Sequence, residues 1–135
     1  MGLTPADGNA ILAANFAPWV LDLGLTVEKV AEGTATLRLP WSDTLAREGG
    51  ALSGQAMMAA ADTASVIALS SLRGEFFPMT TVQLSCSFQR PVIGEDTLVV
   101  AEVSRAGKTM GFVDIALNGS RGVAARVSTV YALLG

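Results

Sequence analysis

One carboxylate in this sequence is unusual because of its surroundings. Residues 54–72, GQAMMAAADTASVIALSSL, form an apolar stretch with helical composition, and Asp62 is its only charged residue. An ionised carboxylate in an apolar environment costs free energy unless it has partners. The chain contains no histidine, so acid–base chemistry falls to carboxylates, lysine, tyrosine or the backbone. Asp62 is therefore the first catalytic candidate; a structural carboxylate satisfied by Thr63, Ser65 or backbone groups is the alternative.

The absence of histidine excludes several common kinds of active site. A Ser-His-Asp triad and a Cys-His pair both need an imidazole ring. Cys86 is the only cysteine, so it can form neither an internal disulfide nor a thiolate zinc site. It lies in an alternating stretch without a basic partner, which favours a buried strand residue over a nucleophile. We expect no metal and no cofactor.

The start of the apolar stretch offers a second candidate group. Ser53 is a natural N-cap, and Gly54 leaves the first helical turn open to close approach. The first N–H groups of a helix have no partner within it, so they can polarise a carbonyl oxygen, as in an oxyanion hole. Gln55 lies seven residues before Asp62 and shares its face, with Met58 between them.

The two candidate groups are too far apart to act together on one small reacting group within one chain. At a rise of about 1.5 Å per residue, Gly54 and Asp62 lie ~12 Å apart along the helix axis. A site that uses both groups would combine Gly54 of one subunit with Asp62 of another. The spacing therefore predicts a symmetric homodimer with the site at its interface, which we expect to pair again into a homotetramer.

Composition predicts one domain, over residues 1–135, with large buried surfaces. Half of the 135 residues are hydrophobic, 16% are charged, and the net charge is −3. These values exclude a disordered acidic protein. The sequence has no cluster of basic residues, so we expect no nucleic-acid partner. The N-terminus has no basic region before an apolar run, so we expect no secretory signal. The apolar run over residues 56–72 is short for a membrane span and carries Asp62, so we expect a cytoplasmic protein without membrane contact.

Hydrophobic periodicity predicts two helices and six strands. A first helix starts at Pro5, behind Thr4 as N-cap, and ends near Phe16 before Pro18, and the central helix runs from Gly54 to Arg73. The expected strands cover residues 23–27, 35–39, 80–89, 97–105, 109–118 and 123–133. This order is typical of an α+β fold in which a curved antiparallel sheet wraps around one long central helix. The central helix is apolar almost all round, so it must be covered on more than one side.

Four stretches of the sequence together resemble a known family. They are GALSGQAMMAAADTAS, TTVQLSCSFQRPVIGED, VSRAGKTMGFVDIAL and VAARVSTVYAL. In order and spacing they are similar to the hotdog-fold acyl-CoA thioesterases of the phenylacetyl-CoA and 4-hydroxybenzoyl-CoA type, over about residues 20–134. The resemblance implies a hotdog fold. It also implies hydrolysis of an acyl-CoA with an aromatic or short-to-medium acyl group to the free acid and CoA, as in phenylacetate degradation.

The resemblance also implies roles for individual residues. Asp62 falls on the catalytic carboxylate, and Gly54 on the glycine whose N–H polarises the thioester carbonyl. Thr81 falls near a position whose hydroxyl helps to place water, and Arg47 where some relatives carry a polar residue lining the site. Whether Asp62 activates water as a general base or attacks directly to form a mixed anhydride stays open.

Two positions depart from the family pattern. Ser53 stands where the family has a histidine, and Gln55 stands where it has a second glycine, although a glutamine hydrogen-bonds the substrate carbonyl in some branches. The missing histidine leaves a second function open, a hotdog protein that binds acyl-CoA without turnover. It also disfavours a hydratase or dehydratase, because such relatives use a catalytic histidine.

Other residues are expected to contact the two ends of the substrate. The candidates for an apolar channel around the acyl group are Met57, Met58, Phe76 and Phe77. The candidates for contacts with the phosphates of CoA are Arg90, Arg105 and Lys108.

Overall fold

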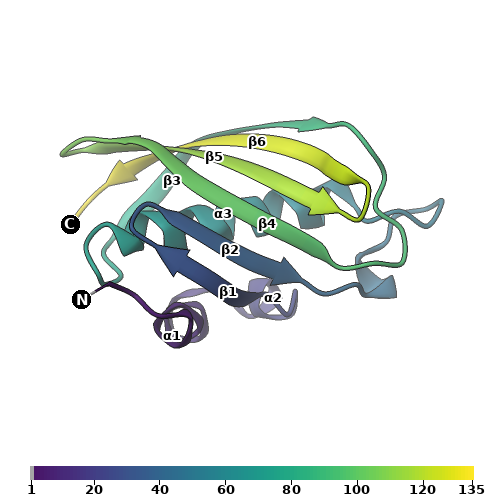
Figure 1. The fold of residues 1–135 in the computed structure, drawn as a ribbon, viewed down its shortest axis with the longest axis horizontal. Helices are drawn as coiled ribbons and strands as arrows, with labels where there is room; N and C mark the ends of the chain where they lie inside the picture. Colours follow the sequence, from purple (N-terminus) through teal and green to yellow (C-terminus); the bar gives the residue numbers. More distant parts are fainter. Residues whose placement is uncertain (1) are drawn as a thin grey trace.

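The apolar stretch forms a long helix, α3 (Gly54–Ser71), around which the sheet curves (Figure 1). The computed structural model describes residues 2–135. The side chain of Ser53 accepts a hydrogen bond from the Ala56 N–H at 3.2 Å, so Ser53 is the N-cap, as expected. The helix ends at Ser71, two residues before the predicted end.

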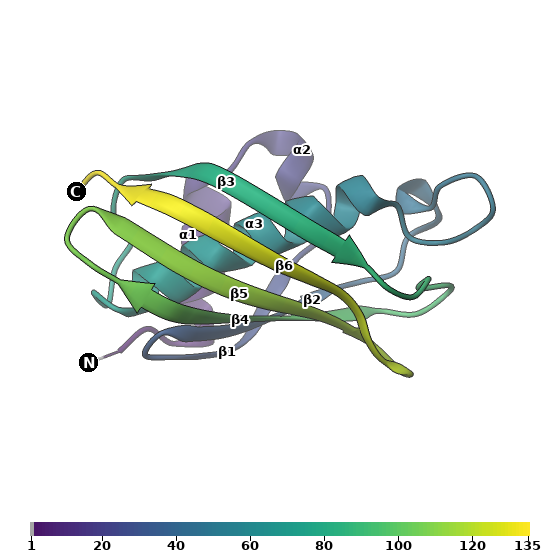
Figure 2. The same cartoon turned by 90° about the horizontal axis from the view of Figure 1, so that it is seen from above.

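One six-stranded antiparallel sheet covers α3, in the order β1-β2-β4-β5-β6-β3. Figure 2 shows β4, β5, β6 and β3 laid side by side across the helix. The bounds of the strands are Thr26–Ala31 (β1), Thr34–Leu39 (β2), Met79–Phe88 (β3), Thr97–Ala106 (β4), Met110–Gly119 (β5) and Gly122–Leu133 (β6). The predicted α+β architecture is therefore confirmed, and β3 is one edge of the sheet.

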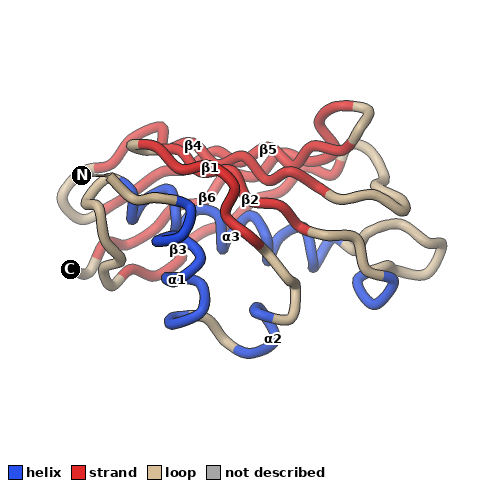
Figure 3. The backbone as a smooth tube through the Cα atoms, turned by 60° about the horizontal axis from the view of Figure 1, so that its bottom comes forward, coloured by secondary structure: helices blue, strands red, loops and turns tan. Residues whose placement is uncertain are grey.

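Two N-terminal helices cover α3 on the side away from the sheet (Figure 3). Helix α1 (Pro5–Asn15) starts with the predicted cap, in which the Thr4 hydroxyl accepts from the Asp7 N–H. The first helix ends before Pro18, as expected. Pro18 also begins a short second helix, α2 (Pro18–Leu21), that the sequence did not predict. The turn after α2 holds Leu23, whose N–H donates to Val20, so β1 begins at Thr26 and not at Leu23.

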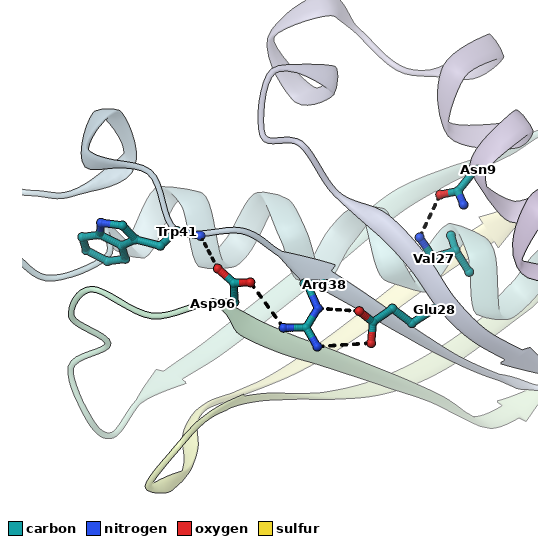
Figure 4. Close-up of polar contacts among 6 residues, drawn as sticks. All are labelled: Asn9, Val27, Glu28, Arg38, Trp41 and Asp96. Carbon is teal, nitrogen blue, oxygen red and sulfur yellow. Dashed lines mark hydrogen bonds and ion pairs between the residues drawn. The ribbon is translucent and has the colours of Figure 1, made fainter.

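Helix α1 is fixed to the neighbouring strand β1 by a hydrogen bond and by close packing. The side chain of Asn9 accepts a hydrogen bond from the Val27 N–H at 2.8 Å (Figure 4). A Cβ atom at Gly8 would lie 2.9 Å from a methyl carbon of Val27, so a glycine is needed for this approach. Ile11 and Leu12 are buried on the same helix. The path of the chain from α1 into α2 is thereby set.

A polar network joins β1, β2 and the start of β4. Arg38 binds Glu28 on β1 and, at 3.3 Å, Asp96 before β4 (Figure 4). Asp96 also accepts the N–H of Trp41 at 2.7 Å, and this bond is the main cause of its lowered pKa. The backbone at Trp41 is where the chain leaves β2 for the segment that leads to α3. The network therefore fixes the start of that segment.

Most of the surface of α3 is buried, and one narrow face is not. The less buried positions are Gly54, Gln55, Met58, Ala59 and Asp62, and all later residues to Ser71 are buried. Steps of three and four residues place Gln55, Met58, Ala59 and Asp62 on one face of a helix. No helix within residues 2–135 is long and apolar enough to cross a membrane.

Candidate active site

The carboxylate of Asp62 is held by two hydroxyl groups from the sheet. Its Oδ1 atom accepts a hydrogen bond from Thr81 Oγ1 at 2.8 Å and another from the hydroxyl of Tyr131, which also lies 2.8 Å from the backbone oxygen of Asp62. The neighbouring helix hydroxyls have other partners, since Thr63 donates to Ala59 and Ser65 to Ala61. The partners expected for a structural carboxylate in α3 are therefore not the ones that it has.

Strand register brings these two hydroxyl groups together. Thr81 on β3 lies directly opposite Tyr131 on β6. A bulge at Val82 then shifts the register, so that Leu84 also faces the core, as Thr81 does. A bulge inserts one unpaired residue and re-aims the side chains next to it. The bulge in β3 thus lets Thr81 face α3 while Leu84, beyond the bulge, still faces the core.

Tyr131 is the site residue that the sequence analysis missed. Its side chain is almost fully buried, and a buried tyrosine usually finds a partner for its hydroxyl. It is the only tyrosine in the chain, which is the one signal that could have drawn attention to it. Burial, with the negative charge of Asp62 as a further cause, raises the pKa of Tyr131 well above its usual value. The phenol therefore stays protonated and acts as a donor to Asp62.

The two oxygens of Asp62 consequently differ. Oδ1 accepts two hydroxyl donors, whereas no hydrogen bond to Oδ2 forms within residues 2–135. Asp62 itself is half-buried, so its side chain is not sealed within the core. A carboxylate fixed through one oxygen presents the other in a defined direction. This arrangement suits a general base or a nucleophile.

A pocket of about 240 Å³ opens beside Asp62. Three of its walls are α3, the start of β3 and the segment that carries α2. Besides Asp62, its lining consists of Phe16, Trp19, Val20, Ala59, Thr63, Val66, Met79, Thr80, Thr81 and Tyr131. Most of these side chains are apolar, and none is a cation.

A separate hollow of about 430 Å³ lies at the N-terminus of α3. It is lined by Gly54, Arg47, Ala51, Leu52, Met57, Phe88, Gln89, Arg90 and Pro91. A Cβ atom at Gly54 would lie 3.0 Å from the ring of Phe88, so the absence of a side chain keeps this approach open. The N–H groups of Gly54 and Gln55 have no acceptor in the described part of the chain. They form a pair of free donors at the positive end of a helix dipole.

The predicted site residues thus lie at two separate places, the pocket beside Asp62 and the hollow at the N-terminus of α3. Asp62 and Thr81 lie at the first pocket, and Gly54, Arg47 and Arg90 at the second. Between them, the side chain of Gln55 is exposed and that of Met58 is half-buried on the open face of α3, while Ser53 is engaged as the cap.

Arg105 and Lys108 lie far from Arg90 in one subunit. They flank the turn between β4 and β5, which is at the end of the sheet where Met110 and Thr80 both pair with Ala132. Arg90 follows the opposite end of β3, where Phe88 pairs with Ala125, and Figure 1 shows these two ends apart. The three cations do not form one cluster within a chain.

The residues expected to form an apolar channel are also dispersed. Met57 lines the hollow at Gly54, and Phe77 is buried with the guanidinium group of Arg73 3.6 Å from its ring centroid. Phe76 and Met58 are half-buried. None of the four lines the pocket beside Asp62.

Cys86 is not placed as a nucleophile, and the acidic side chains are not placed as a metal site. Cys86 packs against the core from β3, and burial raises the pKa of its thiol, which favours the unreactive protonated form. Within residues 2–135, no group of three or more histidine, cysteine, aspartate or glutamate side chains is placed to hold a metal ion.

Comparison with known sequences gives one family and several relatives. Residues 49–122, more than half of the chain, match the thioesterase superfamily. A protein of Halobacterium salinarum, named "Putative esterase VNG_1336C", is 31% identical over 100 residues, which cover 70% of this chain and 66% of that protein. The chain spans about two thirds of the length of the two curated relatives that it matches.

Solved structures confirm the hotdog fold. The Escherichia coli PaaI protein from the phenylacetic acid degradation operon superimposes with a TM-score of 0.85 at 19% identity, covering 96% of this chain and 92% of that one. A hypothetical thioesterase protein from Streptococcus pneumoniae, solved with coenzyme A, gives a TM-score of 0.76 at 16% identity, covering 82% and 86%.

The cap geometry yields a prediction for Ser53. Replacing Ser53 with alanine removes the acceptor of the Ala56 N–H, so the free energy of unfolding should fall by about 1 kcal/mol. Chemical denaturation measures this change, with Thr109→Ala, an exposed residue in the turn between β4 and β5, as the control. A loss no larger than that of the control would mean that Ser53 does not stabilise the helix.

Proposed function

The chain belongs to the thioesterase superfamily, and from that premise we propose that it hydrolyses acyl-CoA thioesters at a site shared by two subunits. The observation that carries the proposal is the carboxylate of Asp62. One of its oxygens is fixed by Thr81 and Tyr131, the other accepts no hydrogen bond within residues 2–135, and Asp62 lines a largely apolar pocket.

Both catalytic routes use the free Oδ2 atom of Asp62. As a general base, Oδ2 takes a proton from water while the water oxygen bonds to the carbonyl carbon. The C–S bond then breaks, and the CoA sulfur leaves with that proton. As a nucleophile, Oδ2 bonds to the carbonyl carbon itself, CoA leaves, and water hydrolyses the mixed anhydride. Thr81 and Tyr131 hold Oδ1 in either route.

The N-terminus of α3 supplies the complementary group. The free N–H groups of Gly54 and Gln55 would stabilise the negative oxygen that develops on the thioester carbonyl. Because the first turn and Asp62 of one helix are ~12 Å apart along the axis, these donors must come from the partner subunit. The exposed side chain of Gln55 is available for a further hydrogen bond to the substrate.

The free edge of the sheet supports the dimer. Strand β3 pairs with β6 on one side only, and its residues Val82 and Phe88 are 54% and 51% exposed. A long, exposed, partly apolar edge strand favours pairing with another chain. Antiparallel pairing of β3 with its copy makes one continuous sheet and sets the two α3 helices in opposite directions. The exposed Val100 and Phe112 on the outer face of the sheet would serve the pairing of two dimers into a tetramer.

The same pairing supports a place for the nucleotide end of CoA. Arg47 and Arg90 lie at the hollow beside Gly54, where they would bind phosphate groups. An antiparallel dimer exchanges the ends of the two sheets. The partner's turn between β4 and β5, with its own copies of Arg105 and Lys108, would then lie at the same end of the assembly as Arg90. The similar Streptococcus pneumoniae protein was solved with coenzyme A.

A second function has one specific observation in its favour. Ser53 stands where the family resemblance places a histidine, and its hydroxyl is engaged in capping α3. A protein that binds acyl-CoA without hydrolysing it would retain both pockets and need no base. Release of thiol from acyl-CoA distinguishes the two functions.

The first functional prediction concerns the charge of Asp62. Asp62→Asn keeps the size of the side chain and removes the base, so kcat should fall at least ~100-fold. Thiol release from a panel of acyl-CoA thioesters measures kcat, and a thermal melt of the same preparation should show little change. Asp114→Asn, an exposed aspartate on the outer face of the sheet, is the control and should behave as wild type. Wild-type turnover in Asp62→Asn would refute the mechanism, and a wild-type protein that binds acyl-CoA without releasing thiol would support the binding function.

The second functional prediction concerns the hydroxyl of Tyr131. Tyr131→Phe keeps the ring and removes one donor to Asp62, so kcat should fall about tenfold, the lower end for a hydrogen bond to a charged group. KM should change little, because the hydroxyl of Tyr131 positions the carboxylate and the ring that lines the pocket is kept. A rise in KM with unchanged kcat would show that Tyr131 acts on substrate binding instead.

A further inference from the structure

The N-terminal segment forms one wall of the pocket beside Asp62. Phe16, Trp19 and Val20 come from the end of α1 and from α2, and they face Ala59 and Val66 of α3 across the pocket. In Figure 3, α2 lies on the opposite side of α3 from β4 and β5. We propose that this pocket binds the acyl group of the substrate, and that α2 limits the acyl group to one aromatic ring or a short chain. The proposal rests on the proposed thioester hydrolysis and assigns its substrate class.

The position of the pocket suits an acyl group. Asp62 lies in its lining, so a carbonyl carbon within reach of Oδ2 would direct its substituent into the pocket. The residues expected from the sequence to form the channel lie elsewhere, as described above. The acyl site is therefore assigned to the N-terminal segment, which the family match at residues 49–122 does not include.

The charge of the lining selects against acidic acyl groups. The only ionisable side chains in it are Asp62 and Tyr131, and both lie at the reacting end. A second carboxylate on the acyl group would find no cation and would be repelled by Asp62. The structure therefore favours a neutral, apolar acyl group over a dicarboxylic one.

The volume of the pocket sets the size of the group. A cavity of about 150 Å³ lined by apolar side chains is large enough to bind benzene. The pocket at Asp62, of about 240 Å³, therefore holds one substituted ring or a short chain, and a long fatty chain exceeds it.

A partition limits the depth of the pocket. A second cavity, of about 30 Å³, adjoins it and is lined by residues of α1, α2, α3 and the segment before β1. Phe16, Val20 and Thr63 line both spaces, so they form the partition between them. Removing the ring of Phe16 would join the two cavities and lengthen the acyl site. Enlarging Val20 would shorten it.

Helix α1 is held firmly in the fold, whereas helix α2, which lines the pocket, is more exposed. Helix α1 is fixed by Ile11, Leu12 and the bond from Val27 to Asn9. Helix α2 has no buried residue, and Trp19 is 63% exposed at the rim of the pocket. Substitutions on α2 are therefore expected to change the substrate range without unfolding the domain.

The first test compares chain-length profiles. The wild type, Phe16→Ala, Val20→Phe and the control Leu134→Ala, an exposed residue near the C-terminus, are assayed with acetyl-, hexanoyl-, decanoyl-, phenylacetyl- and succinyl-CoA. The ratio of kcat/KM for decanoyl-CoA to that for hexanoyl-CoA should rise at least ~10-fold in Phe16→Ala, because single methylenes change such ratios by that order. Val20→Phe should keep its kcat/KM for acetyl-CoA and lose activity with phenylacetyl-CoA. The kcat/KM for succinyl-CoA should be low in the wild type and in every variant. Unchanged profiles in both variants would overturn the proposal.

A second test does not depend on turnover. The chain has two tryptophans, so Trp41→Phe leaves Trp19 as the only one. S-hexyl-CoA, which cannot be hydrolysed, should change the emission of Trp19, and CoA alone should not. Adding Val20→Phe should abolish the change. Binding of S-hexyl-CoA by calorimetry without a change at Trp19 would overturn the proposal, even if the protein proves to hydrolyse thioesters. Emission changes without thiol release from any acyl-CoA would support the acyl site and refute the hydrolase.

Discussion

The two hydroxyl groups that hold Asp62 Oδ1 are the interaction on which the rest of the account depends. Burial removes water from a carboxylate, and the hydroxyl groups of Thr81 and Tyr131 replace that water as hydrogen-bond donors. They therefore let a carboxylate occupy an otherwise apolar helix. They also tie α3 to two neighbouring strands of the sheet, β3 and β6. The bulge at Val82 and the burial of Tyr131 bring the two hydroxyl groups to Asp62. The free Oδ2 atom is its chemical consequence.

The elements of the fold and the key acid could be predicted from the sequence, but the environment of the acid could not. Period and caps located α1, α3 and five of the six strands, since each depends on local pattern, whereas β1 was placed three residues too early. Asp62 was found because a single charge in an apolar helix needs a reason. Tyr131 was missed because its contact depends on the pairing of strands fifty residues apart and on a one-residue bulge, and neither leaves a periodic signal. Helix α2 was missed because Pro18 was interpreted only as a break, although proline is also common at the first helical position.

The length of α3 decides how the two halves of the site can meet. Asp62 lies at the pocket formed with the N-terminal segment, and Gly54 lies at a different hollow with Arg47 and Arg90. The two places are on one rigid helix, so no movement within the chain can bring them to one small group. The exposed edge at β3 offers the way to join them, by pairing with a second copy. The proposed hydrolysis, the proposed dimer and the proposed acyl site therefore all use the same open face of α3.

The shared site is tested most directly with a mixed dimer of two inactive variants. Gly54→Val and Asp62→Asn, each with its own affinity tag, are coexpressed, and the dimer that carries both tags is purified. If the site combines Gly54 of one subunit with Asp62 of the other, this dimer keeps one intact site and should show about half of the wild-type turnover per dimer, although each parent variant is inactive. If both groups act within one chain, the mixed dimer has no intact site. A stable mixed dimer as inactive as its parents would contradict the account.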